Sequence, residues 1–166
     1  MPALTYSYID KLSFMITNLC TLFDSHYLDK GLVIYDSIKK VSNNFHLYIL
    51  AMDDKCYEVL HDLALPYVTP VKLQDFETEE ILKAKSTRSK GEYCWMCMPP
   101  FIKYLLKNFN LNYCTEIDAD MLFYQDPQLL IDELIDSGCS VQFVEHRFAK
   151  NDKREWFVGK YCTQLN

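Results

Sequence analysis

The chain has 166 residues, 49% of them hydrophobic and 14% aromatic, which suits one folded domain with its own core and excludes a disordered chain. It carries 17 Lys and Arg side chains against 23 Asp and Glu, and the resulting net charge of -6 disfavours sequence-independent binding of nucleic acid. A small phosphorylated ligand is still compatible with this charge, because a bound cation can neutralise phosphate locally.

Further features of the sequence concern the compartment and the number of domains. The apolar runs at residues 32–35 and 47–52 are much shorter than the roughly 20 residues that cross a bilayer, so no transmembrane segment is expected. The first residues lack the basic stretch and apolar run of a secretory signal. Seven cysteines are an odd number, which favours reduced thiols in a cytoplasmic protein. Without repeats or linkers, residues 1–166 are expected to form a single domain.

Strand-like and helix-like patterns alternate in the first half of the chain. Residues 13–18 predict a first strand that ends in Thr17 and Asn18. A helix follows, because apolar side chains recur with helical spacing at Leu28, Leu32, Tyr35 and Ile38. The run 45–52 is typical of a strand buried on both faces and stops at Asp53. The next predicted elements are a helix at 57–63, a strand at 68–73, a charged helix at 76–85 and a polar loop at 87–92.

The second half continues the alternation. Pro99-Pro100 is expected to open a helix, because proline lacks an amide hydrogen and is best tolerated in the first helical turn. The remaining predicted elements are that helix to Phe109, a strand at 112–117, a helix started by Asp126-Pro127 and a last strand at 140–144.

This order of elements predicts an α/β fold with a mainly parallel central sheet flanked by helices. Ligands of such sheets bind beyond the carboxyl ends of the strands. The predicted strand ends are all polar, and they are Thr17-Asn18, Asp53-Asp54, Asp118-Ala119-Asp120 and Glu145-His146. We therefore expect a ligand site at this edge of the sheet.

Asp118 and Asp120 are the most informative of these residues. In an extended segment, side chains two positions apart point to the same side, so the two carboxylates would repel each other. A divalent cation relieves this repulsion, since Mg²⁺ or Mn²⁺ prefers carboxylate oxygens and leaves coordination positions for phosphates. The alternative is that Asp-x-Asp is a polar loop. Asp126 is interpreted as a helix cap rather than a ligand.

The residues around this pair resemble a known family signature. The segment from Tyr113 to Phe123 reads YCTEIDADMLF and is followed by Asp126-Pro127. It is similar to the Y-x-D-A-D-hydrophobic-hydrophobic-F signature, closed by D-P, of GT-A glycosyltransferases that use nucleoside-diphosphate sugars. Residues 18–54 are similar to the opening unit of the same family, and the resemblance extends from residue 13 to residue 148.

The resemblance implies a Rossmann-like, nucleotide-sugar-binding part of a metal-dependent glycosyltransferase. The implied donor is a nucleoside-diphosphate sugar, with a UDP-sugar favoured, and the acceptor is unidentified. Asp118 and Asp120 would hold Mn²⁺ or Mg²⁺, and Ala119 would line the donor site. The family's first two strand ends cradle the nucleoside, which implies contacts from Thr17, Asn18 and Asp53. Family domains continue into acceptor-binding segments, so the chain is expected to lack that part.

Other candidates have a functional and a structural interpretation. Arg88, or Lys90 in the same polar loop, could grip the donor diphosphate, but a solvated loop explains it too. His146 could face the donor or the acceptor, or simply form a surface hydrogen bond. Cys94 and Cys97 form a C-x-x-C motif, yet a zinc site needs a second pair and a redox motif is expected after a first strand. Trp95, between them, is expected to pack in the core.

Three functions are compatible with the pattern. The first is sugar transfer, and the second is nucleotide-sugar binding without turnover by a truncated protein. The third is a phosphatase of the haloacid-hydrolase kind, which also places Asp-x-Asp after a strand. In those phosphatases the pair closes the first strand of the domain, whereas here it follows about three others, so this function is disfavoured.

Overall fold

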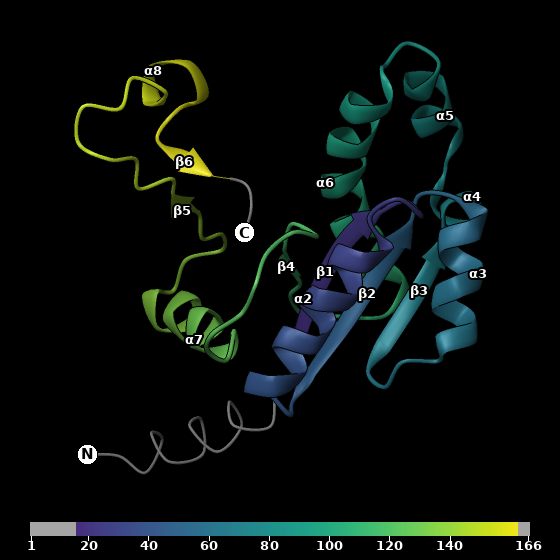
Figure 1. Ribbon diagram of the computed structural model, residues 1–166, viewed down its shortest axis with the longest axis horizontal. Helices are drawn as coiled ribbons and strands as arrows, with labels where there is room; N and C mark the ends of the chain where they lie inside the picture. Colours follow the sequence, from purple (N-terminus) through teal and green to yellow (C-terminus); the bar gives the residue numbers. More distant parts are fainter. Residues whose placement is uncertain (1–15, 163–166) are drawn as a thin grey trace.

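The computed structural model describes residues 16–162 and contains a four-stranded parallel sheet with helices on both faces (Figure 1). All three strand pairings in this sheet are parallel. In spatial order, its strands are β3 (Val68–Lys72), β2 (Phe45–Ala51), β1 (Thr17–Phe23) and β4 (Thr115–Glu116). The predicted fold class, an α/β fold with a mainly parallel sheet, is confirmed.

The central strand β2 illustrates why the sheet is covered on both sides. Every residue of this strand is buried except His46, which is half-buried. A strand without alternation between apolar and polar side chains must bury both faces, and two layers of helices provide that cover.

The first face of the sheet is covered by α2 (Leu28–Val41) and α3 (Asp54–Leu63). Ile34, Tyr35 and Ile38 of α2 are buried in one hydrophobic cluster with side chains of β1 and β2. Gly31 allows α2 to approach the end of β1, because a Cβ atom at this position would lie 2.3 Å from Cζ of Phe23.

The second face is covered mainly by α6 (Lys90–Asn108), preceded by the short helices α4 (Leu73–Phe76) and α5 (Glu79–Lys85). Four buried side chains of α6 are spaced by four residues and form one stripe: Tyr93, Cys97, Phe101 and Leu105. This stripe packs in a second hydrophobic cluster with Cys20, Tyr48 and Leu50 of the sheet.

The chain changes direction in the sheet after β3. Helices α2 and α3 connect β1, β2 and β3 across the first face, whereas α4, α5 and α6 return across the second face to place β4 beside β1. The order β3-β2-β1-β4 therefore has its topological switch point between β1 and β4, where open α/β sheets form a crevice for ligands.

The last part of the chain lies outside this sheet. Helix α7 (Gln128–Ser137) follows β4, and a separate two-stranded antiparallel sheet pairs β5 (Val144–Glu145) with β6 (Tyr161–Cys162). A four-residue helix, α8 (Glu155–Val158), lies in the loop between β5 and β6. The predicted strand at 140–144 is therefore wrong as a fifth strand of the parallel sheet.

Three other predicted boundaries need correction. The first strand begins at Thr17 rather than ending there, and residues 13–15 of the prediction lie outside the described residues. The charged helix predicted at 76–85 is interrupted, because Thr78 caps α5. Pro99-Pro100 lies inside α6 instead of opening a helix.

No helix within residues 16–162 is long and apolar enough to cross a membrane.

Candidate functional site

Acidic residues follow three neighbouring strands at the carboxyl edge of the sheet. Asp24 comes directly after β1, Asp53 comes two residues after β2, and Asp118 comes two residues after β4. The backbone N–H of Ile117 donates to the carbonyl of Cys20 at 2.9 Å, which holds the end of β4 against β1. Asp24 and Asp118 therefore flank the switch point on its two sides.

Asp118 and Asp120 lie in a turn rather than in the extended segment expected from the sequence. The N–H of Met121 donates to the carbonyl of Asp118 at 3.3 Å and closes this turn. Ala119 is buried in the first hydrophobic cluster, whereas Asp118 is half-buried and Asp120 is exposed. The small apolar residue thus anchors the turn to the core, and the two acidic residues flank it in the sequence.

The electrostatics of Asp118 fit the expected repulsion within the pair. Burial raises the pKa of Asp118, and the negative charge of Asp120 raises this pKa further. A positive ion near the two carboxylates would counteract both effects, because it would stabilise the charged form of Asp118 and lower its pKa.

Asp24 forms an ion pair that the sequence did not predict. Its Oδ2 lies 2.5 Å from Nζ of Lys90, the first residue of α6, and its Oδ1 accepts the N–H of His26 at 3.0 Å. Burial acts to raise the pKa of Asp24, but the bonds from Lys90 and His26 outweigh it and lower the pKa. Lys90 therefore reaches the carboxyl edge of the sheet from α6.

Asp53 has a structural role at this edge. Its Oδ1 accepts the N–H of Cys56 at 2.7 Å and caps α3, while its Oδ2 accepts the N–H of Ser25 at 3.0 Å. Burial acts to raise the pKa of Asp53, but these hydrogen bonds lower it overall. Asp53 thus joins the loop after β1 to the start of α3, at the edge where the sequence places it.

Arg88 lies in the turn before α6, two residues from Lys90. It is exposed, and its backbone N–H donates to the carbonyl of Lys85 at 3.4 Å. The polar loop predicted at 87–92 is shorter than expected, because Ser89 caps α6 and shares a reciprocal capping box with Glu92. Lys90 is therefore the first residue of α6, whereas Arg88 lies in the turn just before its cap.

Thr17 and Asn18 are not at the carboxyl edge. They open β1 and pair with Phe45 and His46 at the start of β2, so they lie at the amino edge of the sheet. Thr17 is fully buried, and its hydroxyl bonds to the side chain of Gln128 in α7. The prediction that these residues close the first strand is wrong, and Asp24 occupies that position.

His146 also lies outside the carboxyl edge of the parallel sheet. Its N–H donates to the carbonyl of Lys160 at 3.0 Å in the separate two-stranded unit, and its ring stacks on Phe148 with centroids 4.8 Å apart. The expectation that Glu145-His146 ends a strand of the main sheet is therefore wrong.

The C-x-x-C motif lies on α6, and its second cysteine, Cys97, packs in the second hydrophobic cluster. Cys97 is buried and Cys94 is half-buried. Burial raises the pKa of Cys97 to about 11, so this thiol is protonated at neutral pH and is a poor nucleophile or metal ligand. The expectation that Trp95 packs in the core is wrong, because its side chain is 78% exposed.

No group of three or more His, Cys, Asp or Glu side chains gathers as a metal site in the part of the chain that the structure describes. The pair Asp118 and Asp120 is smaller than such a group. One or two carboxylates are nevertheless the usual protein contribution where Mg²⁺ binds together with a substrate's phosphates. The residues at the switch point therefore fit a cation that shares its coordination with a phosphorylated ligand.

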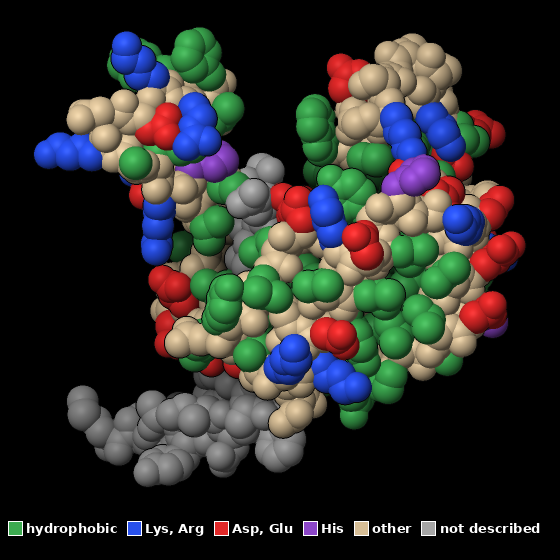
Figure 2. All heavy atoms as spheres, in the orientation of Figure 1, with side chains coloured by type: hydrophobic (Ala, Val, Ile, Leu, Met, Phe, Trp, Pro, Cys, Tyr) green, Lys and Arg blue, Asp and Glu red, His purple; other side chains and the backbone are tan. Residues whose placement is uncertain are grey.

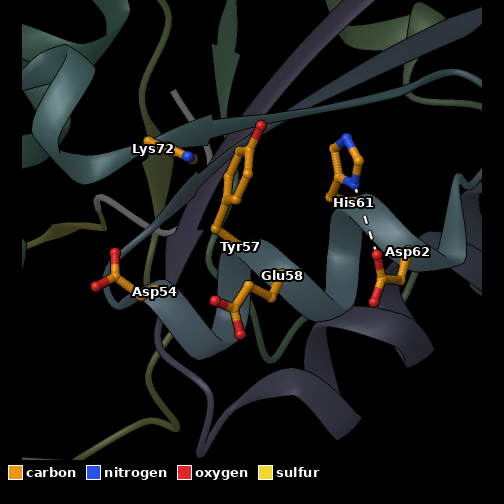
Figure 3. Close-up of a pocket in the computed structure, with 6 residues that line it drawn as sticks. All are labelled: Asp54, Tyr57, Glu58, His61, Asp62 and Lys72. Atoms are coloured by element: carbon orange, nitrogen blue, oxygen red, sulfur yellow. Dashed lines mark ion pairs between the residues drawn. The ribbon is translucent and has the colours of Figure 1, made fainter.

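A hollow of about 600 Å³ lies elsewhere, along the outer surface of α3 (Figure 3). Nζ of Lys72 lies 4.6 Å from the ring centre of Tyr57. The residues that line it are Asp54, Tyr57, Glu58, His61, Asp62 and Lys72. None of them belongs to β1, β4 or the turn of Asp118, so this hollow is distinct from the candidate site.

The fold and the site define a doubly wound α/β protein with an acidic switch point.

No protein-family model matches the chain. Two curated proteins of Bacillus subtilis (strain 168) are similar to it, and both are described only as uncharacterized. YfnD is 32% identical over 128 residues, which cover 76% of this chain and 40% of YfnD. YfnF is 33% identical over 128 residues, which cover 76% of this chain and 42% of YfnF.

The chain thus spans about two fifths of the length of the curated relatives that it matches. Among solved structures, the apo structure of the bifunctional glycosyltransferase WbbM aligns with a TM-score of 0.45 and 17% sequence identity. That alignment covers 71% of this chain and 21% of WbbM.

Proposed function

We propose that this chain is the nucleotide-sugar-binding part of a metal-dependent glycosyltransferase of the GT-A type, with the donor's diphosphate at the switch point between β1 and β4. One observation carries the proposal: the sequence Asp118-Ala119-Asp120 stands at the end of β4, beside β1, and Asp120 raises the pKa of Asp118. The family signature around these residues supports the same function.

In this proposal, Asp118 and Asp120 hold Mn²⁺ or Mg²⁺, and the cation would offset the negative charge that develops on a leaving nucleoside diphosphate. Lys90 supplies a second positive charge from the N-terminal end of α6. Its ion pair with Asp24 keeps the ammonium group at the carboxyl edge before a ligand binds. Asp53 fixes the loop after β1 through its bond to Ser25.

A thermal-shift screen of UDP-, GDP- and CMP-sugars, with and without Mn²⁺, tests the proposal. At a ligand concentration of about 100 Kd, binding stabilises the folded state by about 2.7 kcal/mol, which raises the Tm of a domain of this size by about 5–10 °C. We expect such a rise with at least one nucleotide sugar, with a UDP-sugar as the first candidate, and only when Mn²⁺ is present.

Matched variants locate the site. Asp118→Asn and Asp120→Asn are expected to abolish the metal-dependent rise, whereas Asp126→Asn should retain it. Asp126 is a suitable control because its Oδ1 accepts the N–H of Gln128, the first residue of α7, at 3.0 Å, and the side-chain oxygen of asparagine can accept the same bond. A rise that survives in both Asp118→Asn and Asp120→Asn would refute the site.

The same samples separate sugar transfer from binding without turnover. Release of free UDP from a UDP-sugar, measured over hours, indicates hydrolysis or transfer. A metal-dependent Tm rise without UDP release would instead support the alternative of a nucleotide-sugar-binding protein that lacks turnover.

A further inference from the structure

Helix α8 exposes two aromatic side chains that are consecutive in the sequence. Trp156 is 90% exposed and Phe157 is 88% exposed, and the next residue, Val158, is also exposed. Single exposed apolar residues are normal on a protein surface, but a contiguous apolar group of this kind marks an interaction surface. We call these three residues the aromatic tip.

The aromatic tip is held by backbone hydrogen bonds. The N–H groups of Phe157 and Val158 both donate to the carbonyl of Arg154, at 2.9 and 3.0 Å, and form the turn that displays the two rings. The pairing of β5 with β6 closes the loop that contains this turn. The exposure of the two aromatic rings thus follows from a hydrogen-bonded loop.

The loop also has a charge opposite to that of the whole chain. Residues 145–161 contain five Lys and Arg side chains and three Asp and Glu side chains, a net charge of +2, whereas the complete chain has a net charge of -6. Arg154 pairs with Asp152 at 2.6 Å and Lys160 pairs with Glu145 at 2.8 Å. Figure 2 shows Lys and Arg side chains beside hydrophobic ones around the position of α8.

We propose that the aromatic tip and its flanking cations dock this protein on the surface of an anionic lipid bilayer. Trp and Phe side chains enter the boundary between head groups and acyl chains, and Lys and Arg are attracted to anionic head groups. Lys150 and Lys153 lie in the same loop, and lysine is depleted at protein–protein interfaces, so charge favours lipid over a protein partner. This proposal does not depend on the proposed glycosyltransferase function.

The chain offers a direct spectroscopic test, because it has only two tryptophans. In a Trp95→Phe variant, Trp156 is the single tryptophan reporter. We expect its emission to shift to shorter wavelength, and the protein to sediment, with vesicles of phosphatidylcholine mixed with phosphatidylglycerol. Vesicles of phosphatidylcholine alone should bind much more weakly.

Separate variants of the lysines and of the aromatic residues measure how much charge and how much ring insertion contribute to vesicle binding. Replacing Lys150 or Lys153 by Gln should weaken binding to the anionic vesicles about fivefold for each residue. The double variant Trp156→Ala/Phe157→Ala should no longer sediment. Tyr124→Ala is the control, because Tyr124 is 83% exposed at another position in the chain and its loss should leave binding unchanged.

Three outcomes would overturn the proposal. The first is no sedimentation with the anionic vesicles, and the second is equal binding of the wild type and the Trp156→Ala/Phe157→Ala variant. The third is a blue shift of Trp156 that appears without lipid as protein concentration rises, which would assign the aromatic tip to contact between two copies of the chain.

Discussion

Burial and the negative charge of Asp120 both disfavour the ionised form of Asp118 in the metal-free protein and raise its pKa. Because its folded-state pKa lies above the usual 3.8, the folded protein binds a proton more readily than the unfolded chain. The free energy of unfolding therefore falls as pH rises through the window between the usual pKa and the raised one.

The change Asp118→Asn should accordingly stabilise the metal-free protein at neutral pH. Since Asp118 is only half-buried, the expected gain is small, about 1–3 °C in Tm. The gain should disappear as pH falls below the usual pKa of Asp. Thermal unfolding in chelator, measured for both proteins from pH 7 downwards, checks this; a variant less stable than wild type at pH 7 would contradict it.

Asp53 gives the opposite pH dependence. Its pKa is lowered in the folded state, so its contribution to stability is complete above the usual pKa of 3.8 and is lost as pH falls through the lowered pKa. We expect Asp53→Ala to reduce the free energy of unfolding by about 0.5–2 kcal/mol at pH 7, because the cap of α3 is lost. Asp53→Asn keeps an acceptor oxygen and should cost less, as urea titration of both variants can determine.

Lys90 and Arg88 allow a direct comparison of two neighbouring cations. Lys90 forms an ion pair with Asp24 at the carboxyl edge, so we expect Lys90→Met to weaken Mn²⁺-dependent binding of UDP by about tenfold and Arg88→Met to weaken it less. Calorimetric titration of both variants checks the order. A larger loss of UDP affinity in Arg88→Met than in Lys90→Met would contradict this and would assign the diphosphate contact to Arg88, as the sequence predicts.

Residues at this edge differ in how far the sequence could predict them. Asp118 and Asp120 were found because they follow a buried strand and carry a family signature. The pairing of Asp24 with Lys90 joins residues 66 positions apart and depends on how α6 returns across the sheet, which no local pattern encodes. The one local signal for Asp24 was its place after Leu22-Phe23, an apolar pair that ends β1.

At the scale of elements, the contact of α2 with β1 can be tested with a pair of glycines. A Cβ at Gly31 would meet the ring of Phe23, and both groups lie in the core, so Gly31→Ala should cost about 1–3 kcal/mol. Gly91, in the first turn of α6, has no heavy atom within 4 Å of such a Cβ. Gly91→Ala should therefore be neutral or stabilising by up to about 1 kcal/mol. Equal effects of the two changes in urea titrations would refute this packing.

Two errors in the predicted elements have physical causes. Thr17 and Asn18 looked like a polar strand end, but β-branched Thr fits a strand, and Gln128 of α7 supplies a partner for the buried hydroxyl of Thr17. Pro99-Pro100 looked like a helix start. Buried side chains on both sides of the prolines pack in the same hydrophobic cluster, and this packing outweighs the lost backbone hydrogen bonds.

At the scale of the whole molecule, alternation of strands and helices was enough to predict the parallel sheet. It was not enough to predict which strands are neighbours, since the order β3-β2-β1-β4 follows from the faces on which the connecting helices pack. The segment 140–144 has the composition of a strand, yet only Val144 pairs, and it pairs with Cys162 of β6. The pairing of Val144 therefore depends on β6, which lies later in the chain and is not visible in the local sequence pattern.

The central claim concerns where a metal–diphosphate complex binds on this fold. A crystal structure with Mn²⁺ and UDP, with an anomalous difference map at the manganese edge, tests it most directly. We predict one manganese peak in contact with the carboxylates of Asp118 and Asp120 and with the diphosphate oxygens, at the switch point between β1 and β4. Manganese and UDP bound instead along the acidic surface of α3, with no peak at Asp118 and Asp120, would contradict the proposed site.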